Sequence, residues 1–287
     1  MFKKVLLFCS LFLFLATDGV LAYTYLNVRN PRSWTSMRGT IEEAVISIKP
    51  KGIYMEIGLY LTFSARGWNH SPDDSLEVEF YFDLPKNSIV CDSWLWIEDE
   101  IIRGEIMDKW TASQIYENIV RRRRDPSILY KREGDNYELR IFPMLASESR
   151  KVKITYLVPT QWSATNVAAP LPTNLLDASM YGLSTLYLLT WLEDKWKNPG
   201  ILEFPEIQFM NKSNEVFGEY LQADIPVEAV QSSLHFTLDS PLIDGLYLSK
   251  YQNEMEGVYQ MVFLPSRALN ISTNSKVAIL FDYDSYT

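Results

Sequence analysis

The sequence predicts a mainly β-sheet fold with one α-helix, and three observations support this expectation. Apolar side chains recur at every second position over several stretches, which is the period of a strand with one buried face. Aromatic residues make up 14% of the 287 residues, and such side chains pack well on a pleated surface. A helical period of three and four residues is clear at about 109–123. With 47% apolar and 22% charged residues, the chain has the composition of a folded globular protein.

The first residues have the pattern of a secretory signal peptide. Lys3 and Lys4 precede an apolar run from Val5 to Ala16, and Val20-Leu21-Ala22 offers a cleavage site. The apolar run is shorter than the ~20 residues that span a bilayer. We therefore expect residues 1–22 to be removed with no transmembrane span left, and the protein to be secreted or extracytoplasmic, in the periplasm or at the cell surface. A retained membrane anchor is the alternative.

Strands are expected over most of residues 40–158, because apolar and polar residues alternate there and turn residues stand between the runs. Pro50-Lys51-Gly52 is a turn of this kind, and Leu84-Pro85 ends another run. The expected strands are Thr40 to Ser47, Ile53 to Ser64, Leu76 to Phe82, Ile89 to Ile97, Ile101 to Ile106, Tyr137 to Ile141 and Val152 to Val158.

The helix is expected to begin at Lys109, where Asp108 can cap its free amide groups. Its apolar face is expected to consist of Ala112, Ile115 and Ile119. At its end, positive charge favours the negative pole of the helix dipole, and four arginines stand there: Arg121, Arg122, Arg123 and Arg124. Helix termination with pairing to acidic neighbours is the simpler interpretation of this run. Binding of an anionic glycan or an acidic protein partner is the alternative.

Several short motifs occur in succession between about residues 36 and 160. They are Phe82-Asp83-Leu84-Pro85, Arg103-Gly104-Glu105-Ile106, the helical Ala112 to Tyr116 with Glu117, Arg121 to Pro126 followed by Ile128-Leu129, Phe142-Pro143, and Lys151 to Tyr156. In their order and spacing they resemble the VIT domain, the module of vault proteins and inter-alpha-trypsin inhibitor heavy chains. The resemblance implies a VIT-type β-sandwich with the single helix. One departure is the loop from Met144 to Arg150, which lacks the usual glycine.

The resemblance also implies a second domain near the C-terminus, because in secreted bacterial proteins of this kind a VIT domain precedes a von Willebrand factor type A domain. That domain opens with a buried strand and a metal-binding Asp-x-Ser-x-Ser motif. Here Lys276 to Phe281 is an apolar run followed by Asp282, but Asp284 and Tyr286 replace the two serines. We therefore expect residues 276–287 to be the first strand of a truncated type A-like domain, with an edge strand of the preceding sheet as the alternative. No cofactor is expected, apart from a divalent cation at Asp282 and Asp284 if the rest of such a domain were present.

Residues 170–274 match no motif of this family and are expected to form a β-rich extension packed on the VIT region. Pro170-Leu171-Pro172 marks the boundary between the two. The expected strands of the extension are Leu186 to Trp191, Ile201 to Phe209, Ser233 to Leu238, Leu246 to Leu248 and Val258 to Leu264.

No common catalytic motif occurs in the sequence, so we do not expect an enzyme. It has no Gly-x-Ser-x-Gly, no phosphate-binding glycine loop, no His-Glu-x-x-His and no Cys-x-x-Cys. His70 and His235 have no neighbours that suggest a role as a base or a ligand. The acidic groups Asp73-Asp74 and Glu98-Asp99-Glu100 are expected to face solvent.

Exposed tryptophans could bind sugars by stacking. Trp94 and Trp96 share one face of an expected strand, however, as core residues would, so we expect them to be buried. Cys91 is expected to be a small buried apolar side chain rather than a reactive thiol.

Two functions fit these observations. The formal net charge of −9 argues against a nucleic acid partner. The first function is a non-catalytic secreted or cell-envelope interaction or scaffold protein, which supports protein–protein or adhesion contacts with a protein or an anionic glycan of the envelope. The alternative is an envelope hydrolase that acts on glycans through carboxylates brought together from loops.

Overall fold

The computed structural model describes residues 24–98, 100–105, 107, 109–121, 127–193, 195–215, 217–226, 230, 233–252 and 257–268. The expected signal peptide at 1–22 and the expected type A-like strand at 276–287 lie outside these residues. In the described part, no helix is both long and apolar enough to cross a membrane.

The expected mainly β fold is confirmed. A five-stranded sheet has the order β2 (Ser36–Arg38), β1 (Tyr25–Arg29), β5 (Ser75–Asp83), β9 (Asn136–Leu145) and β8 (Ser127–Lys131). An eight-stranded sheet has the order β15 (Met210–Asn214), β16 (Gly218–Pro226), β13 (Thr185–Thr190), β3 (Thr40–Lys51), β4 (Tyr54–Ser64), β10 (Ser149–Pro159), β6 (Ile89–Ile97) and β7 (Glu100–Arg103).

Two smaller sheets and short helices complete the described part. A four-stranded sheet has the order β11 (Gln161–Trp162), β12 (Asn166–Pro170), β17 (His235–Asp239) and β14 (Gly200–Ile201). A hairpin joins β18 (Leu246–Gln252) to β19 (Gly257–Phe263). The helices are α1 (Lys109–Arg121), the 3-10 helix η1 (Thr173–Ala178) and α3 (Pro265–Ala268).

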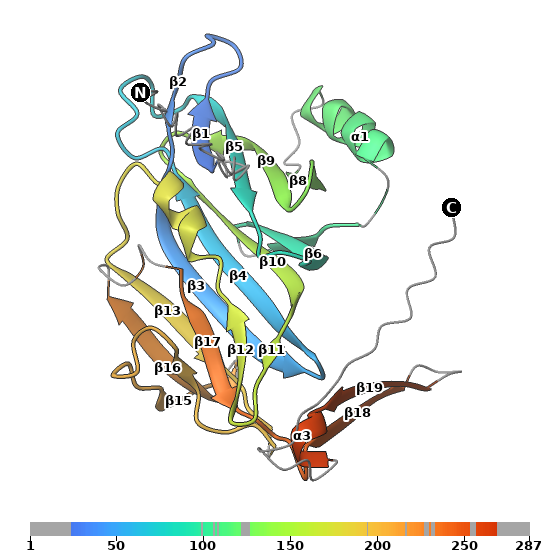
Figure 1. Ribbon diagram of the computed structural model, residues 1–287. Coiled ribbons are helices and arrows are strands. Elements are labelled where there is room, and N and C mark those ends of the chain that lie inside the picture. The colour runs from blue at the N-terminus through green and yellow to red at the C-terminus, as the bar shows by residue number, and fades with distance from the viewer. Residues whose placement is uncertain are drawn as a thin grey trace, which may run out of the picture.

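The long strands β3, β4 and β10 form the middle of the molecule, with the five-stranded sheet at one end and the hairpin at the other (Figure 1). Their alternation sends Ile46, Leu59 and Ile154 into the core, where each is at most 1% exposed. One hydrophobic cluster joins these side chains to those of the five-stranded and four-stranded sheets. The eight-stranded sheet is therefore covered on one face, and its other face carries the polar half of the alternation.

Residues beyond 170 extend the same sheet. Strand β13 pairs in parallel with β3, in a register that places Leu186 opposite Ala44, and β16 and β15 come next toward its edge. The division into units at 36–160 and 170–274 stays a prediction, but the two regions share hydrogen-bonded strands as well as core side chains.

The structure corrects two expectations about elements. Only Gly200–Ile201 is a strand in the stretch expected at Ile201 to Phe209, because Pro205 lacks the amide hydrogen that a ladder needs. Helix α1 begins at Lys109 as expected, but the prediction of its apolar face was wrong. Tyr116 is buried, whereas Ile115 is 42% exposed.

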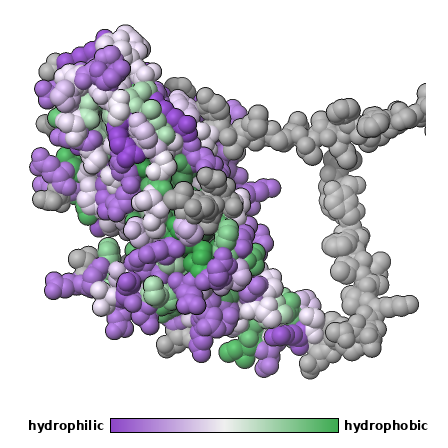
Figure 2. Space-filling view, turned by 90° about the vertical axis from the view of Figure 1, so that its left-hand side faces the viewer, coloured by the Kyte–Doolittle hydropathy of each residue, from purple (hydrophilic) through white to green (hydrophobic). Residues whose placement is uncertain are grey.

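Hydrophilic side chains cover most of the molecular face drawn in Figure 2, and hydrophobic side chains gather between them in smaller clusters.

Candidate functional site

The uncovered side of the eight-stranded sheet carries aromatic and cationic side chains. Cross-strand neighbours in an antiparallel pair point to the same face. The register places Lys153 of β10 between Tyr60 of β4 and Trp94 of β6, and Trp94 opposite Arg103 of β7. We call this surface the open face, and its members are Ser47, Lys49, Glu56, Gly58, Tyr60, Asp92, Trp94, Trp96, Arg103, Lys151, Lys153, Thr155, Trp191 and Phe217.

Cations and rings alternate along one row of the open face. The Lys153 ammonium lies 4.2 Å from the ring centroid of Trp94 and 5.3 Å from that of Tyr60. On the other side, the guanidinium carbon of Arg103 lies 4.6 Å from the Trp94 centroid. In the next row, the Lys151 ammonium lies 5.6 Å from the Trp96 centroid. Such contacts hold each cation against a ring face and fix the ring in turn.

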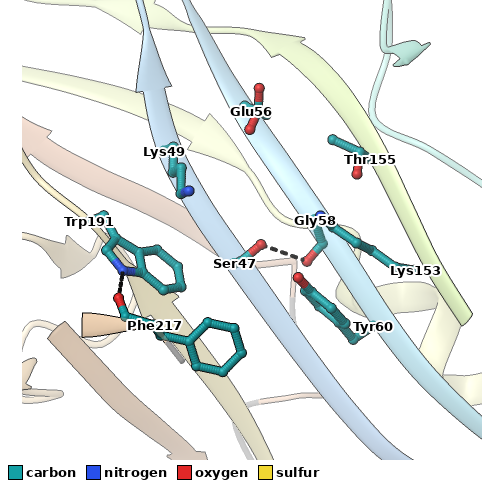
Figure 3. Close-up of a pocket in the computed structure, with 9 residues that line it drawn as sticks. All are labelled: Ser47, Lys49, Glu56, Gly58, Tyr60, Lys153, Thr155, Trp191 and Phe217. Atoms are coloured by element: carbon teal, nitrogen blue, oxygen red, sulfur yellow. Dashed lines mark hydrogen bonds between the residues drawn. The ribbon is translucent and has the colours of Figure 1, made fainter. Parts of the chain in front are cut away.

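A hollow of about 220 Å³ lies beside this row. Trp191 and Phe217 stand on one side of it and Tyr60 and Lys153 on the other (Figure 3). The bottom of the hollow at Gly58 has no room for a larger residue, because a Cβ atom there would lie 2.4 Å from Ser47 Oγ. The hollow is smaller than a drug-sized pocket of about 300–1,000 Å³, so it suits one ring or small group of a longer ligand.

The aromatic wall is held by local contacts. Trp191 Nε1 donates a hydrogen bond to the Phe217 carbonyl oxygen at 3.0 Å, and the Trp191 ring lies 5.7 Å from that of Tyr220. The Lys49 ammonium lies 4.8 Å from the Trp191 centroid. The wall therefore offers a flat apolar surface beside a positive charge.

Positive charge exceeds negative charge on the open face. Its cations are Lys49, Arg103, Lys151 and Lys153, and its carboxylates are Glu56 and Asp92. Glu56 is already paired with Lys51 at 3.2 Å, and Asp92 accepts a hydrogen bond from Trp94 Nε1. Burial lowers the pKa of Lys153, and the nearby Arg103 adds to this, against the opposing effect of the two carboxylates.

A second polar cluster lies on the outer face of the five-stranded sheet, next to α1. Glu138 is 2% exposed, and it accepts hydrogen bonds from Tyr81 at 2.8 Å and from Arg140 Nε at 2.5 Å. Glu77 accepts hydrogen bonds from Arg29 and from the Tyr116 hydroxyl. These carboxylates are occupied by protein partners, so the cluster is structural rather than a ligand site.

The site residues predicted from the sequence fall outside the side chains that the structure describes. Arg121 is the last residue of α1, and its side chain is not described; Arg122, Arg123 and Arg124 lie outside the described residues, as do Asp282 and Asp284. Their proposed roles stay predictions. Within the described ranges, no group of three or more His, Cys, Asp or Glu side chains is placed to hold a metal ion.

The histidines have local partners. His235 Nδ1 lies 2.6 Å from Glu203 Oε1, and the His70 ring packs at 5.2 Å on that of Trp68. Asp74, from one of the acidic pairs, accepts a hydrogen bond from Trp68 Nε1 at 3.0 Å. These contacts account for the side chains without a catalytic role.

Two expectations about side chains on β6 were wrong. Trp94 and Trp96 are half-buried on the open face, and Leu95 between them faces the core at 1% exposure. Cys91 is exposed rather than buried. A signal for the open face was available in Lys151 and Lys153, which alternate with buried Val152 and Ile154, but the sequence does not reveal which strand lies beside them.

Comparisons with known proteins agree with the family resemblance. The family model for the vault protein inter-alpha-trypsin (VIT) domain matches residues 59–156. This match does not reach the expected type A-like segment at 276–287, and a search of curated proteins found no match.

Distant likenesses to solved structures were also found. A candidate nutrient-binding protein of Legionella pneumophila shares 11% identity at a TM-score of 0.39, over 75% of this chain and 72% of its own. Aminopeptidase A of the same organism shares 10% identity at 0.41, over 81% of this chain and 25% of its own. An M1 zinc metallopeptidase of Deinococcus radiodurans shares 10% identity at a TM-score of 0.37, over 78% of this chain and 47% of its own. This chain thus spans about a quarter and about half of the two peptidases, and at these scores the likenesses carry no conclusion about activity.

The matched segment begins within β4 and ends within β10, so it holds the central strands of the open face together with β5 to β9 and α1. Residues 59–156 therefore match the VIT domain, and the residues on either side of them lie outside the match.

Proposed function

We propose that this chain is a non-catalytic interaction module of the cell envelope, and that it binds its partner through the open face. The partner is a protein or an anionic glycan, and the pattern of a signal peptide in the sequence supports an extracytoplasmic location.

The observation that carries the proposal is the outward placement of large aromatic rings among cations. Tyr60, Trp94 and Trp96 are half-buried on a sheet face that needs only small polar residues to be soluble. Tryptophan, tyrosine and arginine are the residue types that most often dominate binding surfaces. The two aromatic residues offer large contact areas with few rotatable bonds, and arginine offers a planar set of hydrogen-bond donors.

The alternative is an envelope hydrolase acting on glycans, and the hollow offers it less support. Glycoside hydrolysis ordinarily needs two carboxyl groups that flank the scissile bond, about 5–9.5 Å apart. The residues that line the hollow include one carboxylate, Glu56, which is paired with Lys51.

The experiment compares binding and hydrolysis on the same preparation. The full chain is titrated against envelope fractions isolated from the producing cells, and released reducing sugar ends are measured in parallel. We expect saturable binding that falls at least tenfold in Lys153→Glu, with no release of reducing ends.

Lys250→Glu is the matched control, because Lys250 also lies near a ring, 5.9 Å from the Tyr259 centroid, but on the hairpin away from the open face. It should bind as the wild type does. Equal binding by both variants would rule out the open face, and release of sugar that stops in Glu56→Gln would favour the hydrolase.

A further inference from the structure

We propose that the ligand of the open face is an acidic polysaccharide, which lies across β4, β10, β6 and β7 with one sugar unit in the hollow. This inference rests on the proposed function, and adds to it the chemical class of the ligand and the residues that bind it.

The cations of the open face lie against aromatic rings but form no ion pair among the described residues. Elsewhere, Arg29, Arg66, Arg132, Arg140 and Arg150 each form an ion pair with a glutamate. In the described part of the chain, Lys49, Arg103, Lys151 and Lys153 form none, although the protein as a whole carries a net charge of −9. Unpaired cations concentrated on one face of an acidic protein are complementary to an anionic partner.

The extent of the row suits a polymer. Tyr60, Lys153, Trp94 and Arg103 come from four neighbouring strands, which lie about 4.8 Å apart. The row is thus about 15 Å long between the outer backbones. Its order of ring, cation, ring, cation matches a chain of sugar rings that each carry a carboxylate.

A buried hydroxyl in the hollow lacks a hydrogen-bond partner. Thr155 Oγ1 is inaccessible to solvent and unpaired among the described residues, and Thr155 lines the hollow opposite Gly58 (Figure 3). Buried polar atoms are almost always hydrogen-bonded, so an unpaired one at a binding surface indicates a missing partner.

The position of the open face disfavours an added peptide strand. The backbones of β4 and β10, at the centre of the row, have strand neighbours on both sides and so offer no free edge for β-strand addition; of the four strands in the path, the sheet edge is at β7. Recognition must therefore come from rings, hydroxyls and cations. Single-stranded nucleic acid would use the same devices, but the expected secretion of the chain favours the polysaccharide.

The test uses polygalacturonate as the probe, with its fully methyl-esterified form as the uncharged control. Binding of the full chain is measured by calorimetry. We expect saturable binding to polygalacturonate, at least tenfold weaker binding to the ester, and at least tenfold weaker binding of polygalacturonate by Lys153→Glu. Lys250→Glu should bind normally.

Thr155→Val separates recognition from folding. It removes an unpaired hydroxyl at nearly constant volume, so the urea unfolding midpoint should stay within error of the wild type while the affinity falls severalfold. An unchanged affinity would overturn the role of the hollow. Trp94→Ala is the second variant, with circular dichroism as its folding check.

The remaining outcomes separate this inference from the proposed function. Equal affinity for the ester and the acid would overturn the role of charge. Tighter binding of polyglutamate or oligo(dT) through the same residues would overturn the polysaccharide and leave the interaction role intact. If no acidic polymer bound and Lys153→Glu still lost its binding to the envelope fractions, the polysaccharide would be overturned and the interaction role would stay intact. Envelope binding that is unchanged in Lys153→Glu would overturn both the polysaccharide and the proposed function.

Discussion

Glu138 carries a buried charge that the fold holds in place. Its carboxylate is almost fully buried and is held by Tyr81, Arg140 and Arg132. Removing one partner of a buried ion pair leaves the other uncompensated, at a cost of about 3–5 kcal/mol when both are buried. Because Arg140 and Arg132 keep contact with solvent, we expect Glu138→Gln to lower the free energy of unfolding by about 2–3 kcal/mol in urea titrations.

The control for Glu138 is an exposed pair. Glu42→Gln weakens the contact with Arg66 at 3.2 Å, and it should cost less than about 1 kcal/mol. Burial raises the pKa of Glu138, but hydrogen bonds from Tyr130 and Tyr81 and the charge of Arg140 bring it below its ordinary range. The stabilisation is therefore present at neutral pH and is lost as the pH falls below about 4. A gap between wild type and Glu138→Gln that does not narrow in acid would contradict this assignment.

Lys153 gives the open face a pH dependence. Since its pKa is lowered, Lys153 loses its charge at a lower pH than the ordinary lysine value of about 10.4. Affinity for an anionic ligand should be full at neutral pH and should decline as the pH rises toward that value. Lys153→Arg should bind at neutral pH and keep its affinity in the alkaline range, because guanidinium stays protonated. An identical decline in both proteins would assign the titration to another group.

At the scale of single residues, the sequence predicts which side chains share a face but not which face is covered. Trp94 and Trp96 were correctly placed together, yet they lie on the open face. Alternation with a period of two separates the two faces of a strand but does not say which of them is buried. The apolar character of tryptophan favoured the buried face, which was wrong. The pairing of Lys153 with both Tyr60 and Trp94 depends on strand order, which local sequence does not contain.

Tyr116 is the anchor of α1. Of the helix positions whose side chains are described, it alone is buried, and its hydroxyl donates to Glu77 Oε1 at 2.9 Å. A hydrogen bond to a charged group contributes about 1.5–3 kcal/mol. We expect Tyr116→Phe to keep the ring in place and to speed amide hydrogen exchange in Lys109–Arg121 by at least about tenfold.

Ile115→Ala distinguishes this anchor from the apolar face that the helical period predicts. Ile115 is exposed, so its removal should leave exchange in α1 nearly unchanged. If Ile115→Ala released the helix and Tyr116→Phe did not, apolar packing would hold α1, and the contact with Glu77 would be incidental.

At the scale of elements, strong local signals predicted well. The alternating runs at β3, β4, β5, β9 and β10 and the start of α1 match the structure, while the expected cap Asp108 lies outside the described residues. Strand β16 was missed because Glu219, Gln222 and Asp224 interrupt its apolar pattern, and the strand expected from Ile201 to Phe209 contains Pro205. Strand β16 lies one strand in from the sheet edge and most of its side chains stay partly exposed, so its sequence carries a weak signal.

At the scale of the whole molecule, the parallel pairing of β13 with β3 was beyond sequence reasoning. The Thr190 hydroxyl donates to the Ile48 carbonyl oxygen at 2.9 Å across 142 residues of chain. Such a contact depends on the free edge that β3 presents once the VIT strands have formed. No local pattern near either residue encodes it.

The shared sheet and core predict that the described part of the chain unfolds as one unit. Leu61 of β4 and Leu188 of β13 are both fully buried in the same hydrophobic cluster, although they lie on opposite sides of the expected boundary at 170. Leu61→Ala and Leu188→Ala should each cost about 2–5 kcal/mol and should each shift a single urea transition, which tryptophan fluorescence and circular dichroism report together. Leu248→Ala, on the exposed side of the hairpin, should shift it by less than about 0.5 kcal/mol. Two separate transitions, with Leu188→Ala moving only one of them, would instead mean that residues beyond 170 fold independently and that β13 adds to a sheet already stable without it.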